Sequence, residues 1–290
     1  MLNRRRFLTI AAASLAAPAQ AASAQEWNGI AMGSAARIVL SGATKEKAER
    51  VFRKVEAVLR QFEQQFSLHR ESDLTRLNRN GWLLHPVNEI QSTCALVDLV
   101  YAATGGAFDP TVQPLWLAIA TGGDTGAASG LTGWTRVRRS ATEIRLEPRM
   151  QITFNGIAQG QAADRVADLM REEGFTNVII DMGEIAALGE RPSGGGWRAD
   201  IAMPDGTKMA RAILSDRALA TSSPAGTLIG KGSPHILDPR GGTHLWRIAS
   251  VSAPSAALAD ALSTAFCIMD RNAIEAALAW FPGSRLEALA

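Results

Sequence analysis

The stretch Trp197-Arg198-Ala199-Asp200-Ile201-Ala202-Met203, followed by Pro204-Asp205-Gly206, decides the fold class of this 290-residue chain. Apolar and polar residues alternate along it, which is the pattern of a strand with one buried face. Pro-Asp-Gly is a turn sequence and residues 210–214 are mostly apolar, so we expect the chain to return as the second strand of a hairpin. Two strands joined by a tight hairpin are antiparallel.

Helices and further strands surround this hairpin. Apolar residues recur at helical spacing between residues 45 and 66, which predicts a long amphipathic helix. Further helices are expected over residues 91–104 and 162–173, after Ser255, and over residues 273–280 with Asn272 as cap. Strands are expected over residues 27–42, with a break at Met32-Gly33-Ser34, and over residues 135–139, 144–146, 151–154, 177–181 and 246–253. Residues 122–133 are expected to form a loop. The elements alternate without a regular βαβ rhythm, which predicts an α+β fold with largely antiparallel sheets and packed helices.

Residues 1–24 have the features of a twin-arginine export signal. Asn3-Arg4-Arg5-Arg6-Phe7-Leu8 precedes a short apolar run, and small-x-small cleavage sites follow at residues 19–21 and 22–24. We therefore expect residues 25–290 to be the mature domain, soluble in the periplasm. No cysteine stands directly after either cleavage site, so a lipid anchor is not expected. The alternative is a basic tail on a cytosolic protein.

The basic character of the chain belongs mostly to that segment. The chain has 30 basic and 28 acidic residues, and removing Arg4, Arg5 and Arg6 leaves 27 basic residues and a net charge of about −1. No Lys/Arg block remains that would indicate nucleic acid, so no nucleic-acid partner is expected. Cys94 and Cys267 lie in apolar helical patterns without CxxC spacing, which favours two buried free thiols over a disulfide, a zinc site or thiol catalysis.

Two short motifs carry the candidate chemistry. Asp260 and Thr264 are four residues apart on a predicted helix, so their oxygen atoms share one face and can bind one hard cation such as Mg²⁺. His235 lies in a turn bounded by Pro234 and Pro239. The pattern indicates a magnesium-assisted reaction on a phosphate ester or anhydride. Alone, the Asp–Thr pair is also typical of a solvated helix face, and the histidine of a turn whose ring binds backbone groups.

A series of short motifs extends along nearly the whole mature chain. In order, they are Met32-Gly33-Ser34, Ser72-Asp73-Leu74 through Asn78, Gly106-Ala107-Phe108-Asp109-Pro110-Thr111-Val112, Gly156-Ile157-Ala158-Gln159-Gly160 with Asp164, Asp181-Met182-Gly183, His235-Ile236-Leu237-Asp238-Pro239, and Ala259-Asp260 through Thr264. Each motif is weak alone, but the ordered set resembles the ApbE family of flavin transferases. The resemblance implies an ApbE-like (T-fold-like) architecture and Mg²⁺-dependent transfer of FMN from FAD to a threonine hydroxyl of a partner protein, with release of AMP.

The resemblance also implies roles for individual residues. Mg²⁺ would be bound by Asp260, Thr264 and the backbone carbonyl of Gly156. The FAD contacts would be Met32, Ala107, Phe108, Asp109, Gln159 and Leu237. His235 would lie beside the flavin phosphate, and either His235 or Asp260 would take the proton from the attacking threonine.

Several positions depart from the family pattern. Thr153 and Gln159 replace charged residues, and His69 replaces a tyrosine that contacts flavin in many members. Gly183-Glu184-Ile185 stands where Gly-Gly-Asp is familiar. Residues 155–160 together with the export signal resemble the NosX-type branch, which implies that the acceptor is a membrane-bound respiratory or electron-transfer subunit.

Two other functions use the same residues. A periplasmic FAD-binding protein without transfer activity would need the pocket but have little need of a complete metal pair. An FAD pyrophosphatase would use water in place of threonine. The retained pair Asp260 and Thr264 favours the transferase.

Overall fold

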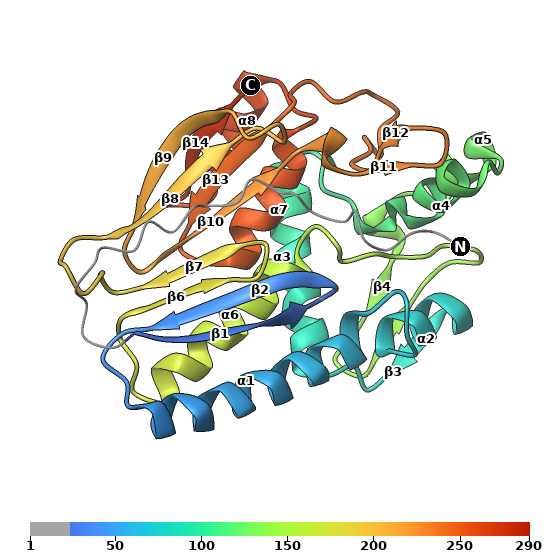
Figure 1. Ribbon diagram of the computed structural model, residues 1–290. Coiled ribbons are helices and arrows are strands. Elements are labelled where there is room, and N and C mark those ends of the chain that lie inside the picture. The colour runs from blue at the N-terminus through green and yellow to red at the C-terminus, as the bar shows by residue number, and fades with distance from the viewer. Residues whose placement is uncertain (1–23) are drawn as a thin grey trace.

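One antiparallel sheet of seven strands organises residues 24–290, which are the residues that the computed structural model describes (Figure 1). Its spatial order is β1-β2-β6-β7-β10-β13-β14. The strands are β1 (Gln25–Ala31), β2 (Ser34–Leu40), β6 (Val178–Asp181), β7 (Ile185–Leu188), β10 (Arg217–Ser222), β13 (Ala249–Ala253) and β14 (Arg285–Leu289). All neighbouring pairs are antiparallel, as the alternating pattern predicts. The expected signal segment lies outside the described residues, apart from Ala24.

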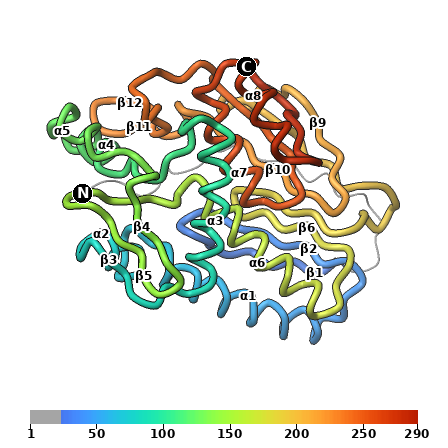
Figure 2. Tube along the Cα trace, turned by 180° about the vertical axis from the view of Figure 1, so that it is seen from behind, coloured from blue at the N-terminus to red at the C-terminus, as the bar shows by residue number. Residues whose placement is uncertain are grey.

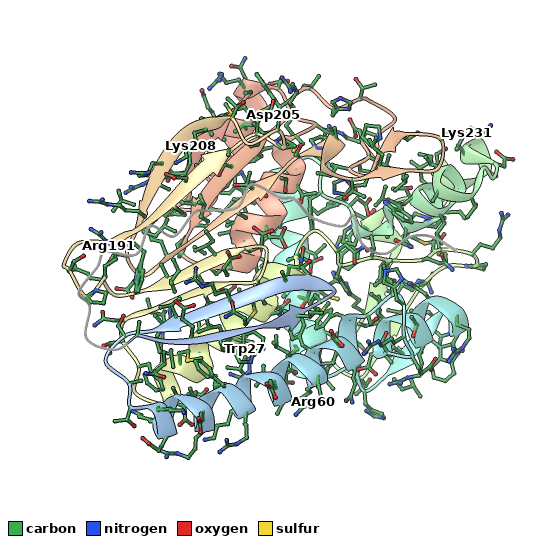
Figure 3. The ribbon with its side chains drawn as sticks, in the orientation of Figure 1. Trp27, Arg60, Arg191, Asp205, Lys208 and Lys231 are labelled. Carbon is green, nitrogen blue, oxygen red and sulfur yellow. The ribbon has the colours of Figure 1, made fainter. Side chains whose placement is uncertain are left out.

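Helices cover one face of this sheet, and Figure 2 shows α3, α6 and α7 side by side on that face. The helices are α1 (Lys45–Phe66), α2 (Asp73–Asn80), α3 (Asn88–Ala103), α4 (Gln113–Thr121), α5 (Thr125–Ser129), α6 (Ala158–Glu172), α7 (Ala256–Phe266) and α8 (Arg271–Leu278). The predicted helix over residues 45–66 is confirmed with the same bounds, and the Thr44 side chain caps it. Trp27 lies between the β1–β2 hairpin and α1 (Figure 3), where its indole N–H donates to Glu56.

The predicted hairpin of β8 (Trp197–Ala202) and β9 (Lys208–Leu214) covers the other face of the sheet. Apolar side chains of β8 form a second core with Ile179 and Ile185 of the central sheet. Lys208 lies on the outer side of the hairpin (Figure 3), where its ammonium group contacts Asp200 at 2.8 Å. The central sheet is therefore buried on both faces.

Short elements form the remainder of the molecule beside the helices. They are the sheet of β3 (Trp82–Leu84), β5 (Glu143–Arg145) and β4 (Arg138–Arg139), the pair β11 (Leu228–Ile229) and β12 (Ser233–Pro234), and the 3-10 turns η2 (Pro110–Val112), η3 (Trp134–Arg136) and η4 (Pro224–Gly226). No helix within residues 24–290 has the length and apolar character needed to cross a membrane.

Some local predictions were wrong. Met32 and Gly33 do not interrupt one strand; they form the two-residue turn between β1 and β2, with φ of 50° and 84°. Residues 151–154 form no strand, because the Asn78 side chain bonds both backbone groups of Ile152 at 2.8 Å. The last helix begins at Arg271, and Asp270, not Asn272, caps it.

Two further predictions have different outcomes. The expected loop over residues 122–133 contains the short helix α5, capped by Asp124. Cys94 and Cys267 are buried free thiols, as predicted. Burial raises the pKa of both thiols to about 12, so neither is a thiolate near neutral pH.

The first turns of α6 and α7 lie in direct contact. A Cβ atom on Gly160 would lie 2.3 Å from the Ala256 carbonyl oxygen, so only glycine allows this approach. One turn later, the carboxylate of Asp164 accepts hydrogen bonds from the backbone N–H groups of Ala256 (2.7 Å) and Ala257 (2.9 Å). These N–H groups have no partner within their own helix, so Asp164 caps α7 from a neighbouring helix.

We expect Gly160→Ala to lower the free energy of unfolding by about 1–3 kcal/mol, because the helices must separate to admit the methyl group. Urea unfolding followed by circular dichroism measures this. Gly123→Ala is the matched control, because its Cβ would lie no closer than 3.5 Å to any described atom beyond its chain neighbours. Equal stability of the two variants would contradict the close helix contact.

Candidate cation and flavin site

Four segments meet at one end of the central sheet. The β1–β2 turn and the β6–β7 turn lie at this end (Figure 1), because β2 and β6 are antiparallel and Asp181 at the end of β6 pairs with Arg37, so that the first half of β2 lies beyond the end of β6. β10 also ends here, since it runs antiparallel to β7 and passes its start. The first turn of α6 packs between this end and α7, which carries Asp260 and Thr264.

The carboxylate of Asp260 binds the start of α6. Its Oδ2 accepts a hydrogen bond from the Gly160 N–H at 3.3 Å, and the residue is only 4% exposed. In a regular helix that N–H would bond the carbonyl of Gly156. Among the described residues, none donates a hydrogen bond to the Gly156 carbonyl or to Asp260 Oδ1. Two oxygen acceptors are therefore left available at this point.

Thr264 lies one helical turn after Asp260 and brings a third oxygen. A Cβ atom on Gly156 would lie 3.1 Å from Thr264 Oγ1 and 3.2 Å from the ring of Phe108, so the backbone at Gly156 runs against both side chains. Thr264 Oγ1 also lies 3.3 Å from Ser222 Oγ at the end of β10. The structure thus brings together the three residues that the sequence predicts as metal ligands. Since Asp260 is buried, the alternative of a solvated helix face does not hold.

The donor set fits Mg²⁺. It consists of one carboxylate, one hydroxyl and one carbonyl, and Mg²⁺ takes oxygen ligands while retaining water and phosphate oxygens. Within residues 24–290, no three His, Cys, Asp or Glu side chains converge as a metal cluster, so a site built from several such side chains is not present in that part of the chain. Burial raises the pKa of Asp260 to about 7, and a bound cation would offset the cost of the buried negative charge.

His235 is held in one tautomer by backbone carbonyls. Its Nδ1 lies 3.0 Å from the Pro224 oxygen and 3.1 Å from the Thr227 oxygen. Carbonyl oxygens only accept hydrogen bonds, so Nδ1 carries the proton and Nε2 of the neutral ring has a free lone pair. Burial lowers the pKa of His235. The segment that binds the ring begins at Pro224, two residues after Ser222. Ser222 Oγ lies 3.3 Å from Thr264 Oγ1, so this segment leads directly away from the Thr264 side chain.

The predicted flavin contacts have different environments. Gln159 Nε2 donates to Ser34 Oγ at 2.8 Å and lies against Gly183, so it connects the β1–β2 and β6–β7 turns. Met32 occupies the left-handed region in the first of these turns. Ala107 and Phe108 are buried, and Leu237 is half-buried.

Asp109 is bound within the protein. One carboxylate oxygen accepts from the Thr111 N–H at 2.8 Å and from its hydroxyl at 2.5 Å, and the other accepts from the Trp134 N–H at 3.1 Å. The carboxylate therefore holds the chain after Phe108 in place.

The sequence interpretation missed three contributors. Ser34 and Ser222 each hydrogen-bond a predicted site residue. Ser34 stood in the first motif without a role of its own, and Ser222 is a single serine in a strand, which carries no signal of that kind. Glu184 was noted only as a departure from a motif, although it is buried and the negative charge of Asp260 helps to raise its pKa.

The structure is an α+β fold in which Asp260, Thr264 and the backbone of Gly156 come together and could hold a cation, with a half-buried histidine, His235, held by the segment that follows β10. The chain belongs to the ApbE family, since the family model matches residues 32–289. The FAD:protein FMN transferase of Chlamydia pneumoniae is 30% identical over 267 residues, covering 81% of each chain. That of Klebsiella pneumoniae is 29% identical over 294 residues, covering 88% of this chain and 82% of the relative.

Solved structures agree with this assignment. The flavinyl transferase ApbE of Pseudomonas stutzeri superposes with a TM-score of 0.76 at 27% identity, covering 89% of this chain and 87% of that one. The ApbE protein of Thermotoga maritima has the same fold, with a TM-score of 0.79 at 23% identity and coverage of 92% and 96%. The predicted family and fold class are confirmed.

We expect Mg²⁺ to raise the melting temperature of the protein and Asp260→Asn to abolish the rise, because the variant removes the only charged ligand of the set. Thr264→Val should weaken the rise, whereas Thr264→Ser, which keeps the hydroxyl, should preserve it. Thermal unfolding over a Mg²⁺ titration measures both effects. An unchanged response in Asp260→Asn would place the cation elsewhere.

Proposed function

We propose that this protein transfers FMN from FAD to a threonine hydroxyl of a partner protein, using Mg²⁺ and releasing AMP. The observation that carries the proposal is the convergence of Asp260, Thr264 and the unbonded carbonyl of Gly156. Family membership and relatives named FAD:protein FMN transferase support it.

The reaction exchanges one phosphorus–oxygen bond for another. The threonine oxygen forms a bond to the FMN phosphorus, and the bond from that phosphorus to the AMP phosphate oxygen breaks. The threonine proton passes to a base, and AMP leaves. When bound, Mg²⁺ supplies positive charge that stabilises the pyrophosphate and the leaving AMP.

His235 is the better candidate for the base. Its Nε2 is unprotonated and free of the hydrogen bonds that fix Nδ1. Asp260 already accepts the Gly160 N–H, and its remaining oxygen belongs to the proposed cation site. We therefore assign the base role to His235 and the ligand role to Asp260.

The substrate contacts follow from the same end of the sheet. Met32, Ala107, Phe108, Gln159 and Leu237 are proposed to contact FAD, and Asp109 to position Phe108. The Gln159 amide carries no charge, so it recognises its ligand by hydrogen bonds.

The site of action and the acceptor rest on the first residues of the chain. A twin-arginine signal over residues 1–24 would export the folded protein to the periplasm. Together with the resemblance to the NosX-type branch, this favours an acceptor threonine on a membrane-bound electron-transfer subunit.

The proposal is tested by incubating the protein with FAD and Mg²⁺, with and without an acceptor domain that carries a threonine. We expect AMP release together with an acceptor mass increase equal to FMN minus water, and loss of both in Asp260→Asn. AMP release without acceptor labelling would favour an FAD pyrophosphatase. Tight FAD binding with neither product would favour a binding protein.

At Mg²⁺ concentrations that saturate the site and so keep Asp260 ionised, we expect transfer to decline at pH values below 6.5, because burial lowers the pKa of His235 from 6.5 and the neutral ring is the active form. The base is thus fully active above that pH and is lost as the pH falls through its lowered pKa. His235→Gln should reduce kcat by about 10²–10⁴-fold and remove this acid limb. A pH–rate profile that keeps the limb in His235→Gln would assign it to another group.

A further inference from the structure

Glu184 is a buried carboxylate at the start of β7, on the helix-covered side of the sheet. Side chains alternate along a strand, and Ala186 and Leu188 lie in the core under the helices, whereas Ile185 and Ala187 face the β8–β9 hairpin. Glu184 shares the face of the first pair. It is 3% exposed, and α6 and α7 pack over this region of β7 and β10.

The carboxylate of Glu184 is only half satisfied. The backbone N–H of Thr221 donates to it, while Oε2 has no hydrogen-bond partner among the described residues. No described Lys, Arg or His forms an ion pair with it; the charged groups that act on it are Asp260 and Asp181, both negative. Burial and these two neighbours raise the pKa of Glu184 well above its usual range.

A structural role does not explain this arrangement. A buried polar atom without a partner costs free energy, and a buried unpaired charge costs more. A carboxylate kept for stability would be bonded on both oxygens, as Asp164 is at the start of α7. The group that satisfies Glu184 therefore lies outside residues 24–290 and carries positive charge or donates a hydrogen bond.

We propose that Glu184 serves the cation site: its free Oε2 accepts a hydrogen bond from a water molecule of the cation bound at Asp260, and its charge strengthens cation binding. This inference rests on the proposed function, because it requires the Mg²⁺ site. Asp181, Glu184 and Asp260 do not form a cluster of direct ligands, so contact through water is the arrangement that fits. Mg²⁺ retains several of its waters, and carboxylates that bind such waters orient the ion.

The test compares Mg²⁺ affinity in Glu184→Gln and in the unaltered protein by isothermal titration calorimetry, with no FAD present. Glutamine keeps an acceptor oxygen for the Thr221 N–H but replaces the free oxygen with an NH₂ group. We expect affinity to fall by about tenfold or more. Without Mg²⁺ the variant should melt at or above the temperature of the unaltered protein, since no unpaired carboxylate is buried.

Asp181→Asn is the matched control. Asp181 precedes the same turn and carries the same charge, but its Oδ1 accepts the Gly183 N–H at 3.2 Å, a bond that asparagine can keep. We expect its Mg²⁺ affinity to change by less than about threefold, because only a distant charge is lost. Equal losses in the two variants would overturn the assignment to the free oxygen of Glu184.

The outcomes also separate this inference from the proposed function. If the unaltered protein binds Mg²⁺, Asp260→Asn does not, and Glu184→Gln binds as tightly as the unaltered protein, the inference is wrong while the proposed function stands. If the unaltered protein binds no Mg²⁺, both are wrong. A tenfold loss in Glu184→Gln, with a melting temperature in the absence of Mg²⁺ that is no lower than that of the unaltered protein, supports the inference.

Discussion

The hydrogen bond from the Gly160 N–H to Asp260 is the contact on which the rest of the site depends. It requires the first turn of α6 to lie against α7, which only glycine at position 160 permits. By taking this N–H away from the carbonyl of Gly156, it leaves that carbonyl without a donor among the described residues, in a stretch of backbone that runs against Thr264. Because the Gly160 N–H bonds Asp260 in place of Gly156, the Gly156 carbonyl and Asp260 Oδ1 are both left without a described donor at the start of α6.

Three carboxylates around this contact, of which Asp260 and Glu184 are buried and Asp164 is half-buried, accept different numbers of hydrogen bonds. Asp164 accepts two backbone N–H groups, and Asp260 and Glu184 accept one each. The negative charge that is not neutralised by hydrogen bonds is therefore concentrated at Asp260 and Glu184, away from the α7 cap. A cation at Asp260 would relieve both groups, and this explains how a fold can tolerate two under-bonded carboxylates in its interior.

The sequence predicted those features that depend on periodicity or on a local motif. The long helix over residues 45–66 and the β8–β9 hairpin follow from spacing alone, and the Asp260–Thr264 pair follows from helical geometry. β7, β10 and β14 were not predicted, because none has the β-branched apolar run of β6 or the turn sequence of the β8–β9 hairpin, and they are held by their neighbours in the sheet. The roles of Ser222 and Glu184 were not predictable, because each depends on which distant residue the fold places beside it.

The same residues would serve transfer and hydrolysis, so the choice between them has to come from the acceptor. His235 presents an unprotonated Nε2 to whichever hydroxyl reaches it, and its ring is fixed by the two carbonyls at Pro224 and Thr227 whether or not a substrate is present. In the proposed reaction, Asp260 and Thr264 would not distinguish threonine from water, because both would act on the phosphate side. Selectivity for transfer therefore requires that the acceptor protein cover the site and exclude water while it delivers its threonine.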